Sequence, residues 1–389
     1  MQPYSQTSIK YLVQASTQGT FWKELAGVVR PFLGSCVTDI GGGLGFLANE
    51  LGLPVTVVER DPLACGYLRA HHGPLVRILE GDAHRLKPER EEGDVVCCNY
   101  GSLLEDLVLA RRWGRRNLIL VVRDHEGHRF TSGERPNPAR RMRLLLESLD
   151  IPYKERQLVA DMGQPFKNEA EVREFSELYH HQGTFPVRKR EGDFPLWLSM
   201  VRKLAILVVS ISDIPDFSSK RTMLVEGLQG VGKSTFVRNI APLADGGFLT
   251  KKVDGKIYLN PIGSAIYDEA HLVGVCAKGG IPTRFDQLGA LCLAKDCTLR
   301  VMDELGFMER DAQTFSHLVL EAASDQIPTI CVIKPCGTPM LDALRALPDA
   351  FCIRFSRENR DAWEKEMERA ARQIPEWPLC ERLRTPAGK

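Results

Sequence analysis

A glycine-rich segment, GLQGVGKST at residues 227–235, has the residue types and spacing to bind the phosphates of a nucleotide. An apolar segment precedes it, and a segment of helical character, FVRNIAPL, follows it. Glycines let the turn curl so that successive backbone N–H groups face one anion, and the following helix adds its dipole. The spacing is that of the Walker A pattern. We predict that these residues contact the nucleotide: Gly227, Gly230, Gly232, Lys233, Ser234 and Thr235.

Four side chains are expected to carry out the phosphate chemistry. Lys233 would bridge the β- and γ-phosphates and act in catalysis, and the Ser234 hydroxyl would ligate Mg²⁺. A second segment, LRVMDELGFME at 299–309, supplies the acids that a triphosphatase needs. Asp303, at the end of an apolar strand, is the second predicted Mg²⁺ ligand. Glu304 beside it is the predicted catalytic base, which would accept a proton from the attacking water.

The C-terminal part of the chain resembles the small nucleoside-triphosphatase family typified by thermophile enzymes and by cancer-related nucleoside-triphosphatase. The resemblance covers roughly residues 221–370 and rests on four segments: GLQGVGKS at 227–234, GGFLTKK at 246–252, DELGFME at 303–309 and ENRD at 358–361. It implies slow, Mg²⁺-dependent hydrolysis of ATP or GTP with tolerance of different nucleotides. Residues 253–285 match the family poorly, so the preferred base stays open.

A kinase is the first alternative for this part of the chain, because the same glycine-rich spacing occurs in small-molecule kinases. Kinases usually close an arginine-rich lid over the phosphates. Lys251, Lys252 and Arg284 are candidates for such a lid, but no lid segment stands out in the sequence. A glutamate directly after Asp303 favours water as the acceptor, and therefore hydrolysis.

A second glycine-rich segment, DIGGGLG at residues 39–45, lies near the beginning of the chain. It follows an apolar strand and precedes a helix. The dinucleotide-binding fingerprint would need a glycine at the position of Phe46, so a nicotinamide dinucleotide site is disfavoured but stays open. Acids end the next two predicted strands, Glu59 after VTVV and Asp82 within LEGDAH.

This arrangement resembles motif I and the following acids of class I S-adenosylmethionine-dependent methyltransferases, at superfamily level and over residues 20–212. The resemblance implies that Asp39 faces the methionine ammonium, Glu59 binds both ribose hydroxyls and Asp82 faces the adenine amino group. The glycines would admit the methionyl part against bare backbone. The predicted contacts with S-adenosylmethionine (SAM) are Asp39, Gly41, Gly43, Gly45, Glu59, Asp82 and Asn99.

The sequence leaves the methyl acceptor open. The segment CCNYGS at 97–102 lacks the Asn-Pro-Pro-Tyr string used to methylate planar amino nitrogens. We assign no catalytic role to His84 or His125. Net charge is +1, without the positive excess of a surface that binds nucleic acid, and the basic run RRWGRR at 111–116 is interpreted as a solvated helix end. We therefore expect a small-molecule acceptor rather than nucleic acid.

Two α/β domains are needed to position these residues. Residues 1–212 alternate short β-branched strands with helices, which is typical of a doubly wound parallel sheet. Residues 213–220 have the composition of a linker, and residues 221–389 start a second α/β pattern. Residues 194–210, FPLWLSMVRKLAILVVS, are expected to form an antiparallel hairpin of the first sheet. The predicted fold is a Rossmann-like methyltransferase domain followed by a P-loop NTPase domain.

Together these features predict a bifunctional cytoplasmic enzyme with SAM, Mg²⁺ and ATP or GTP as its small molecules. The first residues lack a basic segment followed by an apolar one, and the longest apolar stretch is shorter than a membrane span, so neither secretion nor membrane insertion is expected. The second alternative is a nucleotide-switched binding protein with an inactive methyltransferase fold. The sequence does not indicate an oligomeric state.

Overall fold

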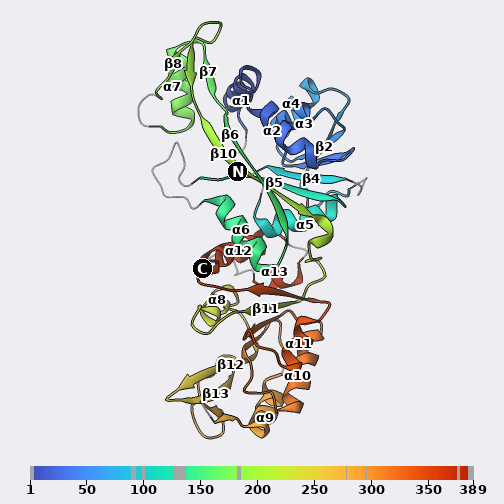
Figure 1. The fold of residues 1–389 in the computed structure, drawn as a ribbon, viewed down its shortest axis with the longest axis vertical. Coiled ribbons are helices and arrows are strands. Elements are labelled where there is room, and N and C mark those ends of the chain that lie inside the picture. The colour runs from blue at the N-terminus through green and yellow to red at the C-terminus, as the bar shows by residue number, and fades with distance from the viewer. Residues whose placement is uncertain are drawn as a thin grey trace. The chain divides into compact units, whose positions relative to one another are not determined.

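The computed structural model describes residues 4–88, 93–98, 101–125, 137–181, 185–276, 278–293, 296–374 and 377–383. Contacts between residues divide the chain into two compact units. The first consists of Met1–Arg143 and Ile151–Ile214, and the second of Leu144–Asp150 and Pro215–Lys389. Each unit contains its own mixed sheet with helices (Figure 1). The predicted fold class, two doubly wound α/β domains, is confirmed.

The first unit is built on a seven-stranded sheet of order β3-β2-β1-β4-β5-β10-β6. Its strands are β1 Val37–Ile40, β2 Val55–Glu59, β3 Val76–Glu80, β4 Asp94–Cys98, β5 Asn117–Arg123, β6 Tyr153–Asp161 and β10 Val201–Ser210. Strands β1 to β5 pair in parallel, and β10 runs antiparallel to both β5 and β6. The order reverses between β1 and β4, which opens a crevice at the carboxyl ends of these strands where α/β sheets bind ligands.

Helices cover this sheet on both faces, with α2, α3 and α4 on one face and α5 on the other (Figure 1). The helices are α1 Gln6–Gln18, α2 Phe21–Val29, α3 Phe46–Leu51, α4 Pro62–His71, α5 Leu103–Trp113, α6 Pro138–Ser148 and α7 Glu169–Leu178. Leu25 and Leu47 pack against Val57 and Ile119 in one buried apolar cluster. This packing fixes the strand ends that carry the predicted SAM contacts.

A separate three-stranded sheet of order β7-β9-β8 accompanies α1 and α7. Its strands are β7 Gln164–Phe166, β8 Arg188–Lys189 and β9 Leu196–Leu198. The prediction of a hairpin over residues 194–210 is wrong, because β9 pairs with β7 and β8 while β10 pairs with β6 and β5. Leu196 and Leu198 are buried with Tyr11 and Phe175 in a small core of their own. That core sets the partner of β9, which its apolar pattern alone does not specify.

The second unit is built on an eight-stranded sheet of order β15-β14-β13-β12-β16-β17-β11-β18. Its strands are β11 Thr222–Glu226, β12 Gly246–Val253, β13 Lys256–Pro261, β14 Leu272–Val275, β15 Gly279–Gly280, β16 Arg300–Leu305, β17 Thr329–Ile333 and β18 Ala350–Arg354. The five strands from β12 to β18 in this order pair in parallel, and β13, β14 and β15 extend the edge as an antiparallel meander.

Helices of the second unit enclose the parallel strands around an aromatic core. They are α8 Lys233–Ile240, α9 Pro282–Leu293, α10 Gln313–Ser324, α11 Pro339–Arg345, α12 Arg360–Gln373 and α13 Pro378–Leu383. Phe248, Phe285 and Phe315 belong to one buried cluster, with the ring centroids of Phe248 and Phe315 5.5 Å apart. The carboxyl ends of β11, β16 and β17 therefore have a rigid support.

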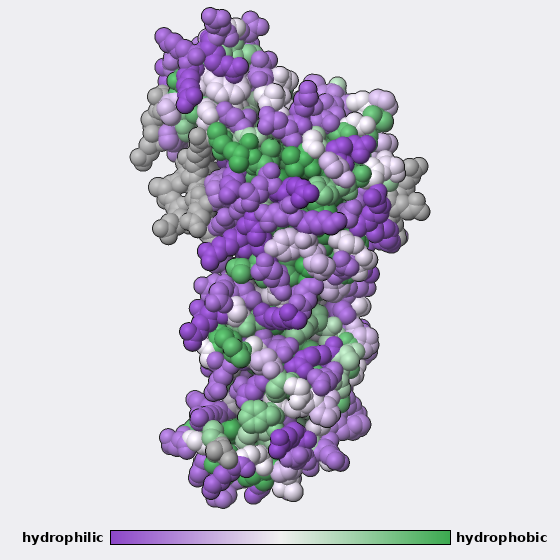
Figure 2. Space-filling view, in the orientation of Figure 1, coloured by the Kyte–Doolittle hydropathy of each residue, from purple (hydrophilic) through white to green (hydrophobic). Residues whose placement is uncertain are grey.

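Hydrophilic residues cover most of the face shown in Figure 2. Within the described ranges, none of the helices combines the length and the apolar composition that a bilayer-crossing helix needs. Trp113, the aromatic residue of the basic run, is 2% exposed and donates a hydrogen bond from its indole N–H to the Ala83 carbonyl at 3.0 Å. Its ring is part of the core and is not exposed for stacking on a base.

Candidate functional site

The first site forms where β1 ends in the glycine-rich turn before α3. Gly41, Gly43 and Gly45 have φ values of 65°, 59° and 73°, a left-handed region that strains residues with a side chain. A Cβ at Gly43 would also overlap the hydroxyl group of Tyr4. Glycine is therefore required in this turn, which presents bare backbone at the carboxyl edge of the sheet.

Asp39 lies near the end of β1 and is 2% exposed. Its Oδ1 has no hydrogen-bond partner among the residues that the structure describes. Burial, together with the charge of Glu59, raises the pKa of Asp39 from 3.8 to about 7. An ammonium group in contact with Oδ1 would stabilise the ionised carboxylate and donate a hydrogen bond to this oxygen. The chemistry of this position suits the ammonium of SAM.

Glu59 ends β2 and is 8% exposed. Its Oε2 accepts a hydrogen bond from the Gly43 N–H at 3.0 Å. Its Oε1 accepts two more from the N–H groups of Arg60 and Asp61, at 2.8 Å and 2.9 Å. These bonds fix the carboxylate against the glycine-rich turn. The structure thus brings Asp39, Gly43 and Glu59 into one cluster.

Asp82 follows β3 at the same edge of the sheet, because the neighbouring Gly81 N–H donates to the Glu59 carbonyl at 2.8 Å. The Asp82 carboxylate accepts the His84 N–H at 2.9 Å in a local turn, and its side chain is 41% exposed. The structure places Asp82 beside the cluster of Asp39 and Glu59. The last predicted SAM contact, Asn99, lies outside the described residues.

His84 has a buried acidic partner that its sequence context does not reveal. Its Nε2 lies 3.3 Å from Oε1 of Glu105, and both side chains are 7% exposed. Glu105 lies in the first turn of α5, where its carboxylate and the hydroxyl of Ser102 form a reciprocal capping box. The cap and the His84 contact together hold the Glu105 carboxylate in one orientation.

The second site forms where β11 ends in the other glycine-rich turn, before α8. Gly230 and Gly232 have φ values of 79° and 99°, so both positions favour glycine. A Cβ at Gly227 would overlap the Phe355 carbonyl oxygen, and that close approach also requires glycine. Thr235, a predicted nucleotide contact, is exposed at the beginning of α8. These residues form the loop expected for phosphate binding.

Lys233 is the first residue of α8 and is 6% exposed. Its ammonium donates hydrogen bonds to the carbonyls of Gly227 and Leu228, at 2.6 Å and 2.9 Å. Burial lowers the pKa of Lys233, while the charges of Glu304 and Asp303 act in the opposite direction. The ammonium therefore lies inside the loop, where a phosphate group bound to the loop would meet it.

Ser234 and Asp303 come together across the site. The Ser234 hydroxyl donates to Oδ1 of Asp303 at 3.0 Å, although the two residues lie 69 positions apart in the sequence. Asp303 is 5% exposed on β16, and burial raises its pKa to about 6, while the bond from Ser234 lowers it. A hydroxyl and a carboxylate are oxygen ligands of the kind that Mg²⁺ prefers. This pair suits the predicted metal position.

Glu304 follows Asp303 at the edge of the site. Its backbone N–H donates to Oγ1 of Thr250 at 3.1 Å, which holds the end of β16 against β12. Its carboxylate Oε1 lies 3.5 Å from Nζ of Lys334, and the two side chains are 30% and 25% exposed. Glu304 is thus partly open to solvent, as a group that activates water must be.

Two basic residues join this site that the sequence did not assign to it. Lys334 follows β17. In the sequence, only the order of the strands could have placed it near the other residues of the site. Arg360 starts α12, and a Cβ at Gly232 would lie 3.1 Å from its Cδ. The segment ENRD at 358–361, which carries part of the family resemblance, was the available signal for Arg360. No comparable signal existed for Lys334.

The part of the chain that the structure describes has no group of three or more His, Cys, Asp or Glu side chains arranged as a metal cage. The candidate Mg²⁺ position instead has Ser234 and Asp303. Mg²⁺ usually keeps several waters and takes further oxygens from the phosphates of its substrate. Two protein oxygens beside a phosphate-binding loop therefore fit this ion.

One known family matches part of the second unit. Residues 281–367 match the family model described as NTPase. The matched range includes Asp303, Glu304, Lys334 and Arg360, and it begins after the glycine-rich loop. No curated protein matches the chain.

Several solved structures are similar to parts of this protein. THEP1 from the hyperthermophile Aquifex aeolicus is 22% identical over 38% of this chain and 96% of its own, with a TM-score of 0.32. A putative RNA methyltransferase from Pyrococcus horikoshii is 15% identical over 50% of this chain and 84% of its own, with a TM-score of 0.30. A SAM-dependent methyltransferase from Thermotoga maritima, described as a possible histamine N-methyltransferase, is 14% identical over 50% of this chain and 91% of its own, with a TM-score of 0.31.

Proposed function

We propose that this protein is a bifunctional enzyme. Its second unit would hydrolyse nucleoside triphosphates such as ATP or GTP with Mg²⁺, and its first unit would transfer a methyl group from SAM to a small-molecule acceptor. The hydrogen bond between Ser234 and Asp303, with Glu304 next in the chain, is the observation that carries the first activity. The buried Asp39, whose Oδ1 lacks a partner among the described residues, carries the second.

For hydrolysis, each residue of the second site has one task. Lys233 neutralises charge on the β- and γ-phosphates, which the loop and the N-terminus of α8 hold in place. Ser234 and Asp303 would hold Mg²⁺, which would supply positive charge near the phosphate oxygens. Glu304 orients a water molecule and accepts its proton as the water oxygen bonds to the γ-phosphorus, while the bond from that phosphorus to the β–γ bridging oxygen breaks and the nucleoside diphosphate leaves. Lys334, whose Nζ lies 3.5 Å from Oε1 of Glu304, holds that carboxylate in position.

A radiolabelled γ-phosphate tests this reaction. We expect the purified protein with Mg²⁺ to release free labelled phosphate from ATP and GTP, and Asp303→Asn to lose that release because the metal ligand is removed. The matched control is Glu368→Gln, since Glu368 is an exposed acid of α12. Label that appears in a product other than free phosphate would establish the kinase alternative instead.

For methyl transfer, the residues of the first site position and shield the reactants. Asp39 would hold the ammonium of the methionyl part, Glu59 the ribose hydroxyls, and the glycines would let that part approach the backbone. Bound SAM supplies an activated methyl group on a sulfonium. The rate then depends on in-line positioning and exclusion of water. The almost balanced charge of the chain, +1, supports a small-molecule acceptor.

Calorimetry with SAM tests this second activity. We expect the wild-type protein to bind SAM and the Asp39→Ala and Glu59→Ala variants to lose that binding. Transfer of a labelled methyl group to components of a metabolite extract would then establish catalysis. SAM binding without transfer to any acceptor would favour a nucleotide-switched binding protein, and binding of a nicotinamide nucleotide in place of SAM would overturn the assignment. The cytoplasmic location stays a prediction from the sequence.

A further inference from the structure

Tyr4 reaches the first site from the segment that precedes α1. Its hydroxyl lies against Gly43, so close that a Cβ at this glycine would overlap it. Its backbone N–H donates to Oδ2 of Asp61 at 3.0 Å, and Asp61 follows β2 two residues after Glu59. The backbone and the hydroxyl of Tyr4 therefore both lie at the carboxyl edge of the sheet.

The surroundings of the Tyr4 hydroxyl are those of the predicted SAM site. Burial and the charges of Glu59, Asp61 and Asp39, in that order, raise the pKa of Tyr4 to about 12. Tyr4 is therefore a neutral phenol at physiological pH. Two of these carboxylates, those of Asp39 and Glu59, are the groups that the methionyl and ribose parts of a bound cofactor would approach.

The space beside Gly43 cannot hold both the Tyr4 hydroxyl and the methionyl part of SAM. A glycine with a positive φ leaves room for a ligand against the backbone, and here the hydroxyl of Tyr4 takes that room. We propose that Tyr4 is a gate of the cofactor site, which competes with SAM for the space beside Gly43 and must turn away before SAM binds. This inference rests on the proposed methyltransferase function.

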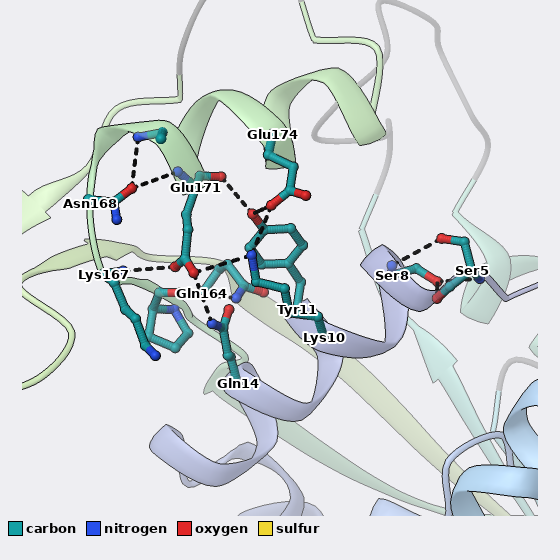
Figure 3. A network of polar contacts seen from close by, with 12 residues as sticks. Ser5, Ser8, Lys10, Tyr11, Gln14, Gln164, Lys167, Asn168, Glu171 and Glu174 are labelled. Atoms are coloured by element: carbon teal, nitrogen blue, oxygen red, sulfur yellow. Dashed lines mark hydrogen bonds and ion pairs between the residues drawn. The ribbon is translucent and has the colours of Figure 1, made fainter.

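The motion assigned to this gate is a rotation of the Tyr4 side chain, because hydrogen bonds hold the backbone that follows Tyr4. Ser5 caps α1 through a reciprocal pair of hydrogen bonds with Ser8, at 2.9 Å and 3.1 Å. Farther along α1, Tyr11 donates to the Glu171 carbonyl at 3.0 Å, and Lys10 lies 2.9 Å from Glu174 (Figure 3). These contacts tie α1 to α7. Opening the gate thus needs only rotation about the side-chain bonds of Tyr4.

The expected size of the effect follows from a population argument. The apparent Kd of a ligand equals its intrinsic Kd divided by the fraction of protein in the open form. If Tyr4 occupies the site in most molecules, removing its ring lowers the apparent Kd for SAM by a factor of about 3 to 10. The gain appears in the association rate constant, because more molecules accept SAM, while the dissociation rate constant changes little.

Three variants test the gate by calorimetry and stopped-flow binding of SAM. Tyr4→Ala removes the ring, Tyr4→Phe removes only the hydroxyl at Gly43, and Tyr153→Ala is the control. Tyr153 is the first residue of β6. It lies at the end of the sheet where the parallel strands begin, whereas the glycine-rich turn lies where they end. We expect SAM to bind most tightly to Tyr4→Ala, less tightly to Tyr4→Phe and least tightly to the wild type and the control.

The outcomes distinguish a failure of the gate from a failure of the proposed methyltransferase function. Equal SAM affinity for wild type and Tyr4→Ala would overturn the gate. Weaker binding by Tyr4→Ala would also overturn it, since Tyr4 would then be a lid that contacts bound SAM. A tighter Kd that arises only from slower dissociation contradicts competition as well. If the wild type and all variants fail to bind SAM, the proposed methyltransferase function fails, and the gate with it.

Discussion

The two sites place their carboxylates in opposite electrostatic surroundings. In the first unit, Asp39 is buried next to the like charge of Glu59, and the Glu59 carboxylate is held by backbone N–H groups. In the second unit, Asp303 receives the Ser234 hydroxyl, and Lys334 lies 3.5 Å from Glu304. The two acids of the first site thus repel each other, whereas the acids of the second site have protein cations beside them.

This difference indicates what each site demands from its ligand. A pair of buried acids whose charge the protein does not balance favours a ligand that brings a cation, such as the ammonium of an amino acid. A site in which the ammonium of Lys233 lies among loop carbonyls, close to Asp303, suits a ligand that brings both an anion and a metal ion. A variant that changes one of the two sites should therefore leave the other unchanged.

Removing the loop cation has the largest expected effect. In Lys233→Ala the second site keeps its acids and Lys334 but loses the loop cation that would stabilise the γ-phosphate. We expect hydrolysis to fall by about 1000-fold or more, measured as phosphate release under saturating Mg²⁺-ATP.

Two measurements confine that effect to the nucleotide site. Lys365→Ala removes an exposed lysine of α12 and should keep wild-type phosphate release. SAM binding by Lys233→Ala should equal that of the wild type. A Lys233→Ala protein that hydrolyses ATP at the wild-type rate would contradict the assignment of this loop.

Neutralising the predicted base has the next largest effect. Glu304→Gln keeps the size of the side chain but cannot accept a proton, so hydrolysis should fall by about 100-fold, within the range of general-base catalysis. Nucleotide affinity should stay near the wild-type value, because Lys233 and the loop bind the phosphates. Calorimetry with a non-hydrolysable ATP analogue separates binding from the chemical step. A large loss of affinity with an unchanged rate would contradict the role of base.

The sequence predicted the parts of both sites that are local in the chain. The turn DIGGGLG lies between β1 and α3, and Glu59 ends β2, as expected, because glycine turns and apolar runs mark where these elements begin and end. The glycine-rich loops were visible for the same reason. Each residue there is fixed by its neighbours, through a positive φ or a helix N-terminus.

Contacts that depend on tertiary packing were not predictable in this way. Tyr4 and Lys334 reach the sites from distant segments, and no spacing rule connects them with the loops. The hairpin expected over residues 194–210 failed for the same reason, since the burial of Leu196 against α1 and α7 selects the partner of β9. An apolar strand pattern specifies a face to bury but not the surface that buries it.

The ionisation of Asp39 should make the affinity for SAM depend on pH. The ammonium of SAM needs the ionised carboxylate, and the pKa of Asp39 is about 7. Affinity for SAM should therefore rise by up to about tenfold between pH 6 and pH 7.5 as Asp39 loses its proton. In Asp39→Asn this rise should vanish, and affinity at pH 7.5 should be about tenfold lower than wild type, or ~1.4 kcal/mol. Calorimetry across the pH range measures both.

The same carboxyl group should affect folding stability, with a defined sign. A carboxyl whose folded-state pKa is raised contributes stability below its unfolded pKa, and this contribution is lost as pH rises through the folded pKa. For Asp39 the window runs from about pH 4 to about pH 7. Over that window the wild type should lose up to about 4 kcal/mol relative to Asp39→Asn, at 1.36 kcal/mol per unit. Parallel pH profiles of wild type and variant in chemical unfolding would contradict the raised pKa.

The smallest expected effect comes from Lys334, which balances the second site without contacting the loop backbone in the way that Lys233 does. Lys334→Met keeps the apolar length of the side chain but removes the ammonium, whose Nζ lies 4.9 Å from the ring centroid of Phe307. The partly exposed ion pair with Glu304 is worth little on its own, so hydrolysis should fall by only about threefold. Phosphate release under saturating Mg²⁺-ATP measures this change. A loss as large as that of Lys233→Ala would mean that Lys334 acts on the phosphates instead, and the balance of charges in this site would then lie between Lys334 and the substrate.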